Sequence, residues 1–208
     1  MNLKTRISWF RDKIKYGLFL FGLRNRLKKI GLDICIEYLE VEDVLKIEEP
    51  IIPMDSDTYA IEFLNKEDMV IVGEKSNVGN VQKLCKGFDK GQTCIGVKQN
   101  QEIAAFMFIE YNTIDFRHKR VDLKEDEAYL LNMFTLNGHR GKNLAPYLRY
   151  HSYAFLRKRG VNKIYSITDY FNKSSLKFKK KLKAQHAKLY WTVVFFRKYK
   201  RGGVLKTF

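Results

Sequence analysis

Cysteine is scarce in this sequence. The 208 residues include three, Cys35, Cys85 and Cys94, an odd number in which no two form a C-x-x-C pair. Disulfide scaffolds need an even set of cysteines, and zinc ribbons need closely spaced pairs. The sequence therefore argues against both classes, and it favours a reducing compartment, which predicts a cytoplasmic protein.

Long apolar runs are also missing. No stretch approaches the roughly 20 apolar residues that span a bilayer, which argues against an integral membrane protein. The short run 17–22 continues into Arg24 and Arg26 with no small-residue cleavage site, so a signal peptide is disfavoured. With 45% hydrophobic and 30% charged residues, the chain is typical of a globular protein with a full core.

Charge is abundant and unevenly distributed. The net charge is +16, made of +8 over residues 1–31, −10 over 32–69, zero over 70–127 and +18 over 128–208. Asp169 is the only acid in the last of these segments. The C-terminal part is therefore expected to attract phosphates, nucleic acid or an acidic membrane face.

The chain divides into two predicted parts near residue 57. Residues 1–57 are predicted to form a basic amphipathic helix over 4–30 and then an acidic connector that contains two prolines. The helix has two interpretations. It packs on the core, or it lies peripherally on an anionic membrane surface or a partner protein. Residues 58–208 form the second part.

Apolar residues in the second part alternate between the periods of strands and helices. Antiparallel strands are predicted first and a β-α-β unit follows, which predicts a mixed α/β fold with a mostly antiparallel central sheet plus an N-terminal helical extension. The lysine-rich stretch 177–183 is interpreted as a solvated helix face. Strands are predicted at 59–64, 92–97, 103–111, 128–136, 163–168 and 189–197, and helices from Asn65 as the cap, at 77–87, 143–159 and 173–183.

A tight basic turn separates the strand 128–136 from the helix 143–159. It contains Gly138, Arg140 and Lys142. The first N–H groups of a helix have no intrahelical acceptor, and the helix dipole is positive there. A pyrophosphate suits such a site, so the turn is a candidate for anion binding.

Two short motifs carry a resemblance to a known family. Arg140-Gly141-Lys142-Asn143-Leu144-Ala145 resembles the Gln/Arg-x-x-Gly-x-Gly/Ala signature of the GNAT superfamily of acyl-CoA-dependent N-acyltransferases. Asn143 replaces the glycine that lets the family's backbone approach the pyrophosphate. Asn172-Lys173-Ser174-Ser175, which follows the next strand, resembles the family's Asn-x-x-Ala/Ser motif. The resemblance covers residues 58–208, which we call the acyltransferase-like domain.

The resemblance implies an activity and a set of binding residues. It implies an N-acyltransferase that uses acetyl-CoA as cosubstrate and inserts the pantetheine arm between two splayed parallel strands. Backbone groups at the end of the strand would pair with the pantetheine amides, and amides of the turn would hold the pyrophosphate. The cofactor-binding residues that it implies are Phe134, Thr135, Leu136, Arg140, Gly141, Lys142, Asn143, Leu144, Ala145, Asn172 and Ser175.

The implied reaction is attack of an amine on a thioester, which needs a base. The candidate catalytic carboxylates are Glu110, Glu127 and Asp169, although a solvated or salt-bridged role is the simpler interpretation of each. Many family members protonate the leaving thiolate with a tyrosine, and the matching position here is Lys179. Tyr170 or Ser174 would then serve as the acid, or no acid is used.

The acceptor is predicted to be a primary amine of a small anionic molecule, for which an amino sugar or sugar nucleotide is a guess from charge alone. The alternative is a non-catalytic basic module that binds RNA or an anionic membrane surface through 4–30 and the C-terminal part. A third hypothesis is that the chain is a degenerate family member, which keeps the cleft but no longer catalyses acyl transfer. Nucleic acid is the less favoured partner. The four histidines are scattered without ligand spacing, so no metal is predicted.

Overall fold

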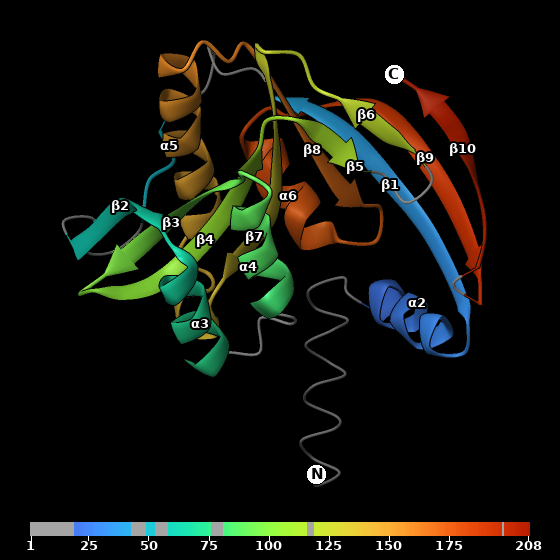
Figure 1. Ribbon diagram of the computed structural model, residues 1–208, viewed down its shortest axis with the longest axis horizontal. Coiled ribbons are helices and arrows are strands. Elements are labelled where there is room, and N and C mark those ends of the chain that lie inside the picture. The colour runs from blue at the N-terminus through green and yellow to red at the C-terminus, as the bar shows by residue number, and fades with distance from the viewer. Residues whose placement is uncertain (1–18, 43–48, 53–57, 76–80, 116–118, 197) are drawn as a thin grey trace, which may run out of the picture. The chain divides into compact units, whose positions relative to one another are not determined.

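The computed structural model describes residues 19–42, 49–52, 58–75, 81–115, 119–196 and 198–208, which form two compact units (Figure 1). The central unit comprises residues 42–114 and 121–166. The terminal unit comprises 1–41, 115–120 and 167–208. The predicted boundary at residue 57 falls within the span of the central unit, next to residues 53–57, which lie outside the described part.

The central unit is built on a mostly antiparallel sheet with the order β2-β3-β4-β7-β8. Only β7 and β8 run parallel, in a ladder from Glu127↔Lys163 to Leu130↔Ser166, and α5 connects them. The mixed α/β fold class with a β-α-β unit is therefore confirmed. The elements are β2 (Tyr59–Leu64), β3 (Thr93–Gln99), β4 (Glu102–Glu110), β7 (Glu127–Thr135), α5 (Leu144–Lys158) and β8 (Lys163–Asp169), whose last residues belong to the terminal unit.

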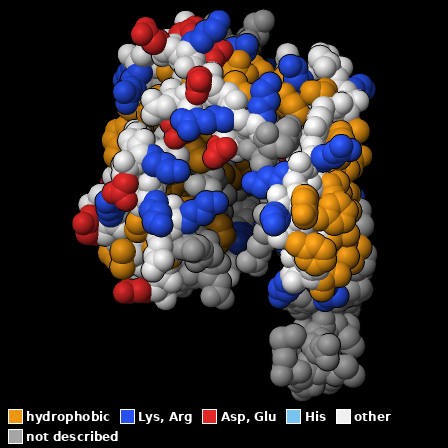
Figure 2. All heavy atoms as spheres, turned by 45° about the vertical axis from the view of Figure 1, so that its right-hand side comes forward, with side chains coloured by type: hydrophobic (Ala, Val, Ile, Leu, Met, Phe, Trp, Pro, Cys, Tyr) orange, Lys and Arg blue, Asp and Glu red, His pale blue; other side chains and the backbone are white. Residues whose placement is uncertain are grey.

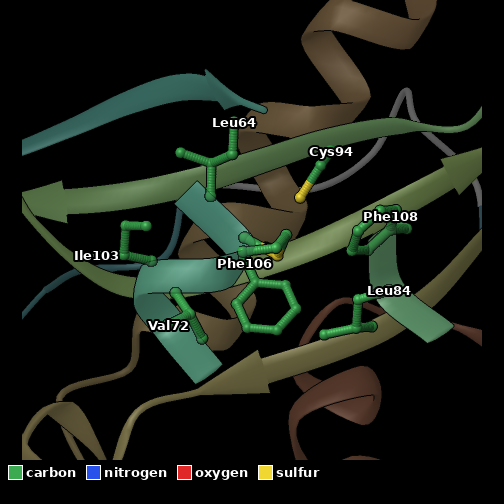
Figure 3. Close-up of a cluster of buried hydrophobic side chains, with 8 residues drawn as sticks. Leu64, Val72, Leu84, Cys94, Ile103, Phe106 and Phe108 are labelled. Atoms are coloured by element: carbon green, nitrogen blue, oxygen red, sulfur yellow. The ribbon is translucent and has the colours of Figure 1, made fainter. Parts of the chain in front are cut away.

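Helices cover both faces of this sheet, because β4 is apolar on both. Helices α3 (Lys66–Lys75) and α4 (Val81–Asp89) lie on one face and α5 on the other (Figures 1 and 3). Asn65 caps α3 as predicted, since its Oδ1 accepts from the Asp68 N–H at 2.9 Å. The Asp68 carboxylate in turn accepts from the Asn65 N–H, also at 2.9 Å. Figure 3 shows the core beneath α3 and α4, made of Leu64, Met69, Val72, Leu84, Cys94, Ile103, Phe106 and Phe108.

The terminal unit holds a second antiparallel group, in which β9 lies between β10 and β1. Two residues separate α2 from β1, and three separate β8 from α6. The elements are α2 (Phe19–Lys29), β1 (Leu32–Glu42), α6 (Lys173–Lys181), β9 (Gln185–Phe195) and β10 (Tyr199–Thr207). Short strands β5 (Thr113–Asp115) and β6 (Arg120–Asp122) pair with each other.

Four described strands were not expected from the sequence, namely the short β5 and β6 and two long ones. Residues 32–42, predicted as part of an acidic connector, form β1, and residues 199–207 continue the sheet as β10 beyond the predicted last strand. The predicted helix over 4–30 is described from Phe19 to Lys29, and residues 4–18 lie outside the described part.

The acids of β1 explain why it forms a strand despite its polarity. Asp33, Glu40 and Glu42 are all buried, with exposures of 6%, 1% and 1%. Each meets a buried base within its own unit. Arg24 Nε lies 3.1 Å from Asp33, Lys179 Nζ lies 2.6 Å from Glu40, and Arg149 Nε lies 2.7 Å from Glu42. Burial of these carboxylates is tolerable because each is paired.

The interpretation of the lysine-rich stretch 177–183 as a solvated helix face is wrong for one residue, Lys179. Lys177, Lys180, Lys181 and Lys183 are exposed as a solvated helix face requires, but Lys179 is 3% exposed and bonds to Glu40 and Thr168. Sequence alone does not separate them, because the buried partner lies 139 residues away.

Arg149→Met is expected to lower the free energy of unfolding by about 3–5 kcal/mol, because it leaves the Glu42 carboxylate buried without its guanidinium. Tyr153 also donates to Glu42, and burial followed by that charge raises its pKa, so the phenol does not replace the lost cation. Urea unfolding followed by circular dichroism measures the change. Lys158→Met, at an exposed position of the same helix, is the control and should change stability by less than about 0.5 kcal/mol. Equal effects of the two variants would contradict the assignment.

Candidate active site

The turn between β7 and α5 is held by contacts of its own residues. The Leu136 N–H donates to the Ala104 carbonyl at 2.9 Å, and the short 3-10 helix η2 (Asn137–His139) follows. Arg140 Nε donates to the Thr135 carbonyl at 3.1 Å, and its guanidinium lies 5.5 Å from the centre of the Phe134 ring. These contacts fix Arg140 beside the end of β7.

Asn143 is the residue that the resemblance matches to the glycine of the family signature. Its backbone is left-handed, with φ 62° and ψ 18°, and it is the N-cap residue of α5. Its side chain makes no cap bond, and its Nδ2 instead donates to the Ile51 carbonyl at 2.9 Å. Glycine enters the left-handed region without strain, and asparagine is among the residues that tolerate it best. The turn therefore keeps the shape that glycine would give it.

The electrostatics of the turn favour an anion. The first turn of α5 contains no acid, and Arg140 and Lys142 lie just before it. Burial, and then the charge of Lys142, lower the pKa of His139. The N–H groups of the first helical turn add the positive end of the dipole.

A cavity of about 470 Å³ adjoins the turn in the central unit. It is lined by α3, by the hairpin between β3 and β4, and by Leu136–His139. Asp68, Glu74 and Glu102 place three carboxylates on its wall. No local sequence pattern indicated this grouping, because Asp68 and Glu74 on α3 meet Glu102 of β4 only in the folded unit.

The Asn172 motif lies in the terminal unit and has a clear structural basis. Asn172 Oδ1 accepts from the Ser175 N–H at 3.2 Å and so caps α6. An N-cap side chain reaches the third helical residue, which explains the spacing of Asn-x-x-Ser. The Asn172 N–H donates to the Asp169 carbonyl at 2.9 Å, which ties the motif to the end of β8.

Glu110 and Glu127 are engaged in turns of the central unit. Glu110 accepts from Gln92 and from two backbone N–H groups, and Glu127 accepts from Tyr165 at 3.0 Å. Glu127 begins β7, eight residues before Thr135, or about 26 Å along the strand. Glu110 pairs with Tyr129 in the same half of β7. The structure does not bring either carboxylate to the Arg140 turn.

The candidate catalytic side chains of the terminal unit differ in how far solvent reaches them. The Asp169 carboxylate forms an ion pair with Arg24 and accepts from the Phe171 N–H at 2.9 Å. Tyr170 is 43% exposed, and its ring stacks on Tyr38 with the centres 5.6 Å apart. The Lys179 ammonium is held by Glu40. Of these side chains, the phenol of Tyr170 is the one that solvent reaches most readily.

Metal ligands do not gather anywhere in the described ranges. No group of three or more histidine, cysteine or acidic side chains there could hold a metal ion. Likewise, no helix among the described residues is long and apolar enough to cross a membrane.

Comparison with protein families identifies one match. Residues 58–183, more than half of the chain, match the model of the acetyltransferase (GNAT) family. A search of curated protein sequences found no match.

Solved structures share the fold at low sequence identity. The glucosamine N-acetyltransferase region of a fungal multi-domain β-N-acetylglucosaminidase has a TM-score of 0.61 at 13% identity and covers 84% of this chain and 22% of its own. A Drosophila protein has a TM-score of 0.59 at 15% identity, and the match covers 84% of this chain and 57% of that protein. A tandem GNAT protein from the clavulanic acid biosynthesis pathway has a TM-score of 0.56 at 12% identity, and the match covers 85% of this chain and 55% of that protein. The chain therefore spans less than two thirds of the length of each of these structures.

Asn143→Gly is expected to be more stable than Asn143→Ala by about 1–2 kcal/mol. Both variants lose the bond to Ile51, so the difference isolates the cost of a side chain at φ 62°. Thermal unfolding followed by circular dichroism measures it.

Asn162 provides the matched control for this comparison. It is exposed and its φ is not positive, so glycine there should be no more stable than alanine. The same order of stability at both positions would show that the left-handed backbone is not the cause.

Proposed function

The chain belongs to the acetyltransferase (GNAT) family, and we propose that it transfers an acetyl group from acetyl-CoA to a primary amine of a small acceptor. One observation carries the proposal. The β7–α5 turn has a left-handed residue at the family's glycine position, directly before a helix N-terminus flanked by Arg140 and Lys142. This arrangement suits the pyrophosphate of coenzyme A.

The edge of β7 supports the placement of the pantetheine arm. The parallel ladder to β8 covers Glu127–Leu130, while β7 continues to Thr135. In this second half, β7 is bulged against β4, because Phe106 pairs with Phe134 and Phe108 with Leu131. A strand has two edges of peptide groups, and pairing with β4 uses one of them. The other edge near Phe134–Leu136 is where the pantetheine amides would bind.

The chemistry requires little more than placement and proton transfer. The acceptor nitrogen forms a bond to the thioester carbon, the carbon–sulfur bond breaks, and the acceptor loses a proton. Placement of the two reactants and an N–H directed at the developing oxyanion supply most of the rate. We assign the acid that protonates the leaving thiolate to Tyr170, because the position used by other family members is Lys179, whose ammonium is held by Glu40. Asp169 is retained as the candidate base.

The acceptor that we propose is an amine with an anionic portion, such as an amino sugar or sugar nucleotide. The net charge of +18 over residues 128–208 favours the anionic portion. The carboxylates of the cavity beside the turn suit an ammonium group. The fungal structure of similar fold is described as a glucosamine N-acetyltransferase region, and glucosamine is therefore a sensible first acceptor to test.

Binding of acetyl-CoA without turnover is the second candidate. Two ion pairs favour this candidate. Lys179, which the resemblance matches to the family's tyrosine, is paired with Glu40, and Asp169, the candidate base, is paired with Arg24. Both groups are therefore engaged in contacts that do not serve catalysis. A protein of this kind would bind coenzyme A and release no thiol.

Arg140→Ala is expected to weaken acetyl-CoA binding by about tenfold or more, because a charge-assisted contact to phosphate is lost. Ala145→Trp should weaken it as well, by filling the space at the helix end. Isothermal titration calorimetry measures both. Lys158→Ala removes one positive charge at the far end of α5 and is the matched control. Unchanged affinity in both site variants would overturn the assignment of the site.

Tyr170→Phe is expected to lower kcat for thiol release by about 10²-fold or more while acetyl-CoA affinity is retained, since only the proton of the phenol is removed. A panel of primary amines that includes glucosamine is assayed for free thiol. Tyr199→Phe, at a tyrosine that is 67% exposed, is the control. Thiol release at the normal rate by Tyr170→Phe would exclude Tyr170 as the acid. No release with any amine, together with tight acetyl-CoA binding, would favour the second candidate.

A further inference from the structure

Large apolar side chains are exposed at one end of the terminal unit. Ile30, Phe195, Phe196 and Tyr199 have exposures of 71%, 49%, 75% and 67%. They come from the turn between α2 and β1 and from the turn between β9 and β10. We call these four residues the aromatic tip. A single exposed apolar residue is ordinary, but a contiguous group of large ones marks an interaction surface.

Backbone and ring contacts bring the two turns of the aromatic tip together. The Phe196 N–H donates to the Gly31 carbonyl at 2.7 Å. Phe195 pairs with Leu32 on β1 and with Tyr199 on β10, and partners in register share a face of the sheet. The ring of Phe196 lies over Gly31, where an added Cβ would meet it at 2.6 Å. These contacts join the two turns into one surface, on which Ile30 directly precedes the glycine that the Phe196 ring covers.

Basic residues surround the aromatic tip. Lys28, Lys29, Lys198 and Lys200 are exposed beside it, and Lys28 keeps 53% of its side chain exposed although it contacts Asp33. Residues 170–208 contain no acid. Asp33, the nearest acid on β1, is buried against Arg24. Figure 2 shows apolar side chains gathered among lysines and arginines on the side of β9 and β10.

We propose that the aromatic tip inserts into the interface of a lipid bilayer that carries anionic headgroups. Aromatic and aliphatic side chains gain from leaving water at this depth, and rings with a polar atom are favoured at the headgroup level. The lysine stems extend along the apolar surface and carry their ammonium groups to the lipid phosphates. The attraction of each lysine adds to that of the others, because the surface potential of such a membrane is negative.

The charge and shape of the aromatic tip favour a membrane over two other partners. A second copy of this chain would bring the same lysines face to face, and like charges oppose such contact. RNA is bound through phosphate contacts and stacked bases, and an exposed isoleucine such as Ile30 serves neither kind of contact. This inference is independent of acetyl transfer, because the aromatic tip contains none of the residues assigned to that reaction.

Vesicle co-sedimentation of the full chain tests the proposal. Binding is expected for phosphatidylcholine vesicles that contain phosphatidylglycerol and is expected to fall by about tenfold or more for phosphatidylcholine alone. Ile30→Ser with Tyr199→Ser should weaken binding to the anionic vesicles by about tenfold or more. Both side chains are mostly exposed, so their replacement leaves the fold intact, which circular dichroism verifies.

Two matched controls separate the aromatic tip from the overall positive charge. Ile51→Ser with Val70→Ser removes apolar side chains that are 83% and 48% exposed in the central unit, and it should leave binding unchanged. Lys198→Glu with Lys200→Glu should weaken binding by at least about tenfold, and Lys86→Glu with Lys90→Glu, the same charge change in the central unit, should have a smaller effect.

A direct measurement of insertion completes the test. The fluorescence of Tyr199→Trp, compared with the unchanged chain, should be quenched by lipids brominated on their acyl chains. Absence of added quenching, or equal losses in the tip variants and their controls, would overturn the proposal. A tight RNA complex that the tip variants weaken, with vesicle binding unchanged, would assign the surface to RNA and also overturn it.

Discussion

The pairing of buried acids on β1 with distant bases is the constraint on which both units depend. Asp33 and Glu40 are neutralised by Arg24 and Lys179 in the terminal unit, and Glu42 by Arg149 in the central unit. A buried carboxylate without its cation is strongly destabilising, so each strand and helix that supplies a base must be in place for β1 to be buried. Burial tends to lower the pKa of Arg149, but the charges of Glu42 and Tyr153 and the hydrogen bonds to both residues together outweigh burial and raise that pKa.

The same pairs limit what the family's chemistry can use. Lys179, which the resemblance matches to the tyrosine of other members, has its ammonium bound to Glu40. Asp169, the lone acid after residue 128, is bound to Arg24. What the chain keeps is the binding part of the signature, in which Asn143 takes the left-handed conformation that glycine would take. The turn therefore has the backbone shape that phosphate binding would use in the proposed function, which assigns proton transfer to another side chain.

The net charge of a segment does not by itself say which of its basic residues reach the surface. Part of the positive charge after residue 128 lies inside the protein, since Arg149 and Lys179 are 1% and 3% exposed. Exposed positive charge lies in several described places, which include the lysine-rich stretch 177–183, and two of them differ in kind: the turn around Arg140 and the lysines beside the aromatic tip. The first adjoins a helix end and suits a compact phosphate, and the second surrounds apolar side chains and suits an extended interface.

The sequence by itself determined the mixed α/β class, the β-α-β unit and the cap at Asn65, because local periodicity and capping depend on neighbours within a few residues. It also pointed to the Arg140 turn through a contiguous motif. Tertiary structure decided that 32–42 is a strand, that Lys179 is buried, and that the tips of two turns form one apolar surface. In each of these cases the deciding partner lies far away in the chain, as Glu40 and Lys179 do, 139 residues apart. A local pattern cannot distinguish an acid that faces water from one that faces its counter-ion, because only the packed fold brings the counter-ion to it.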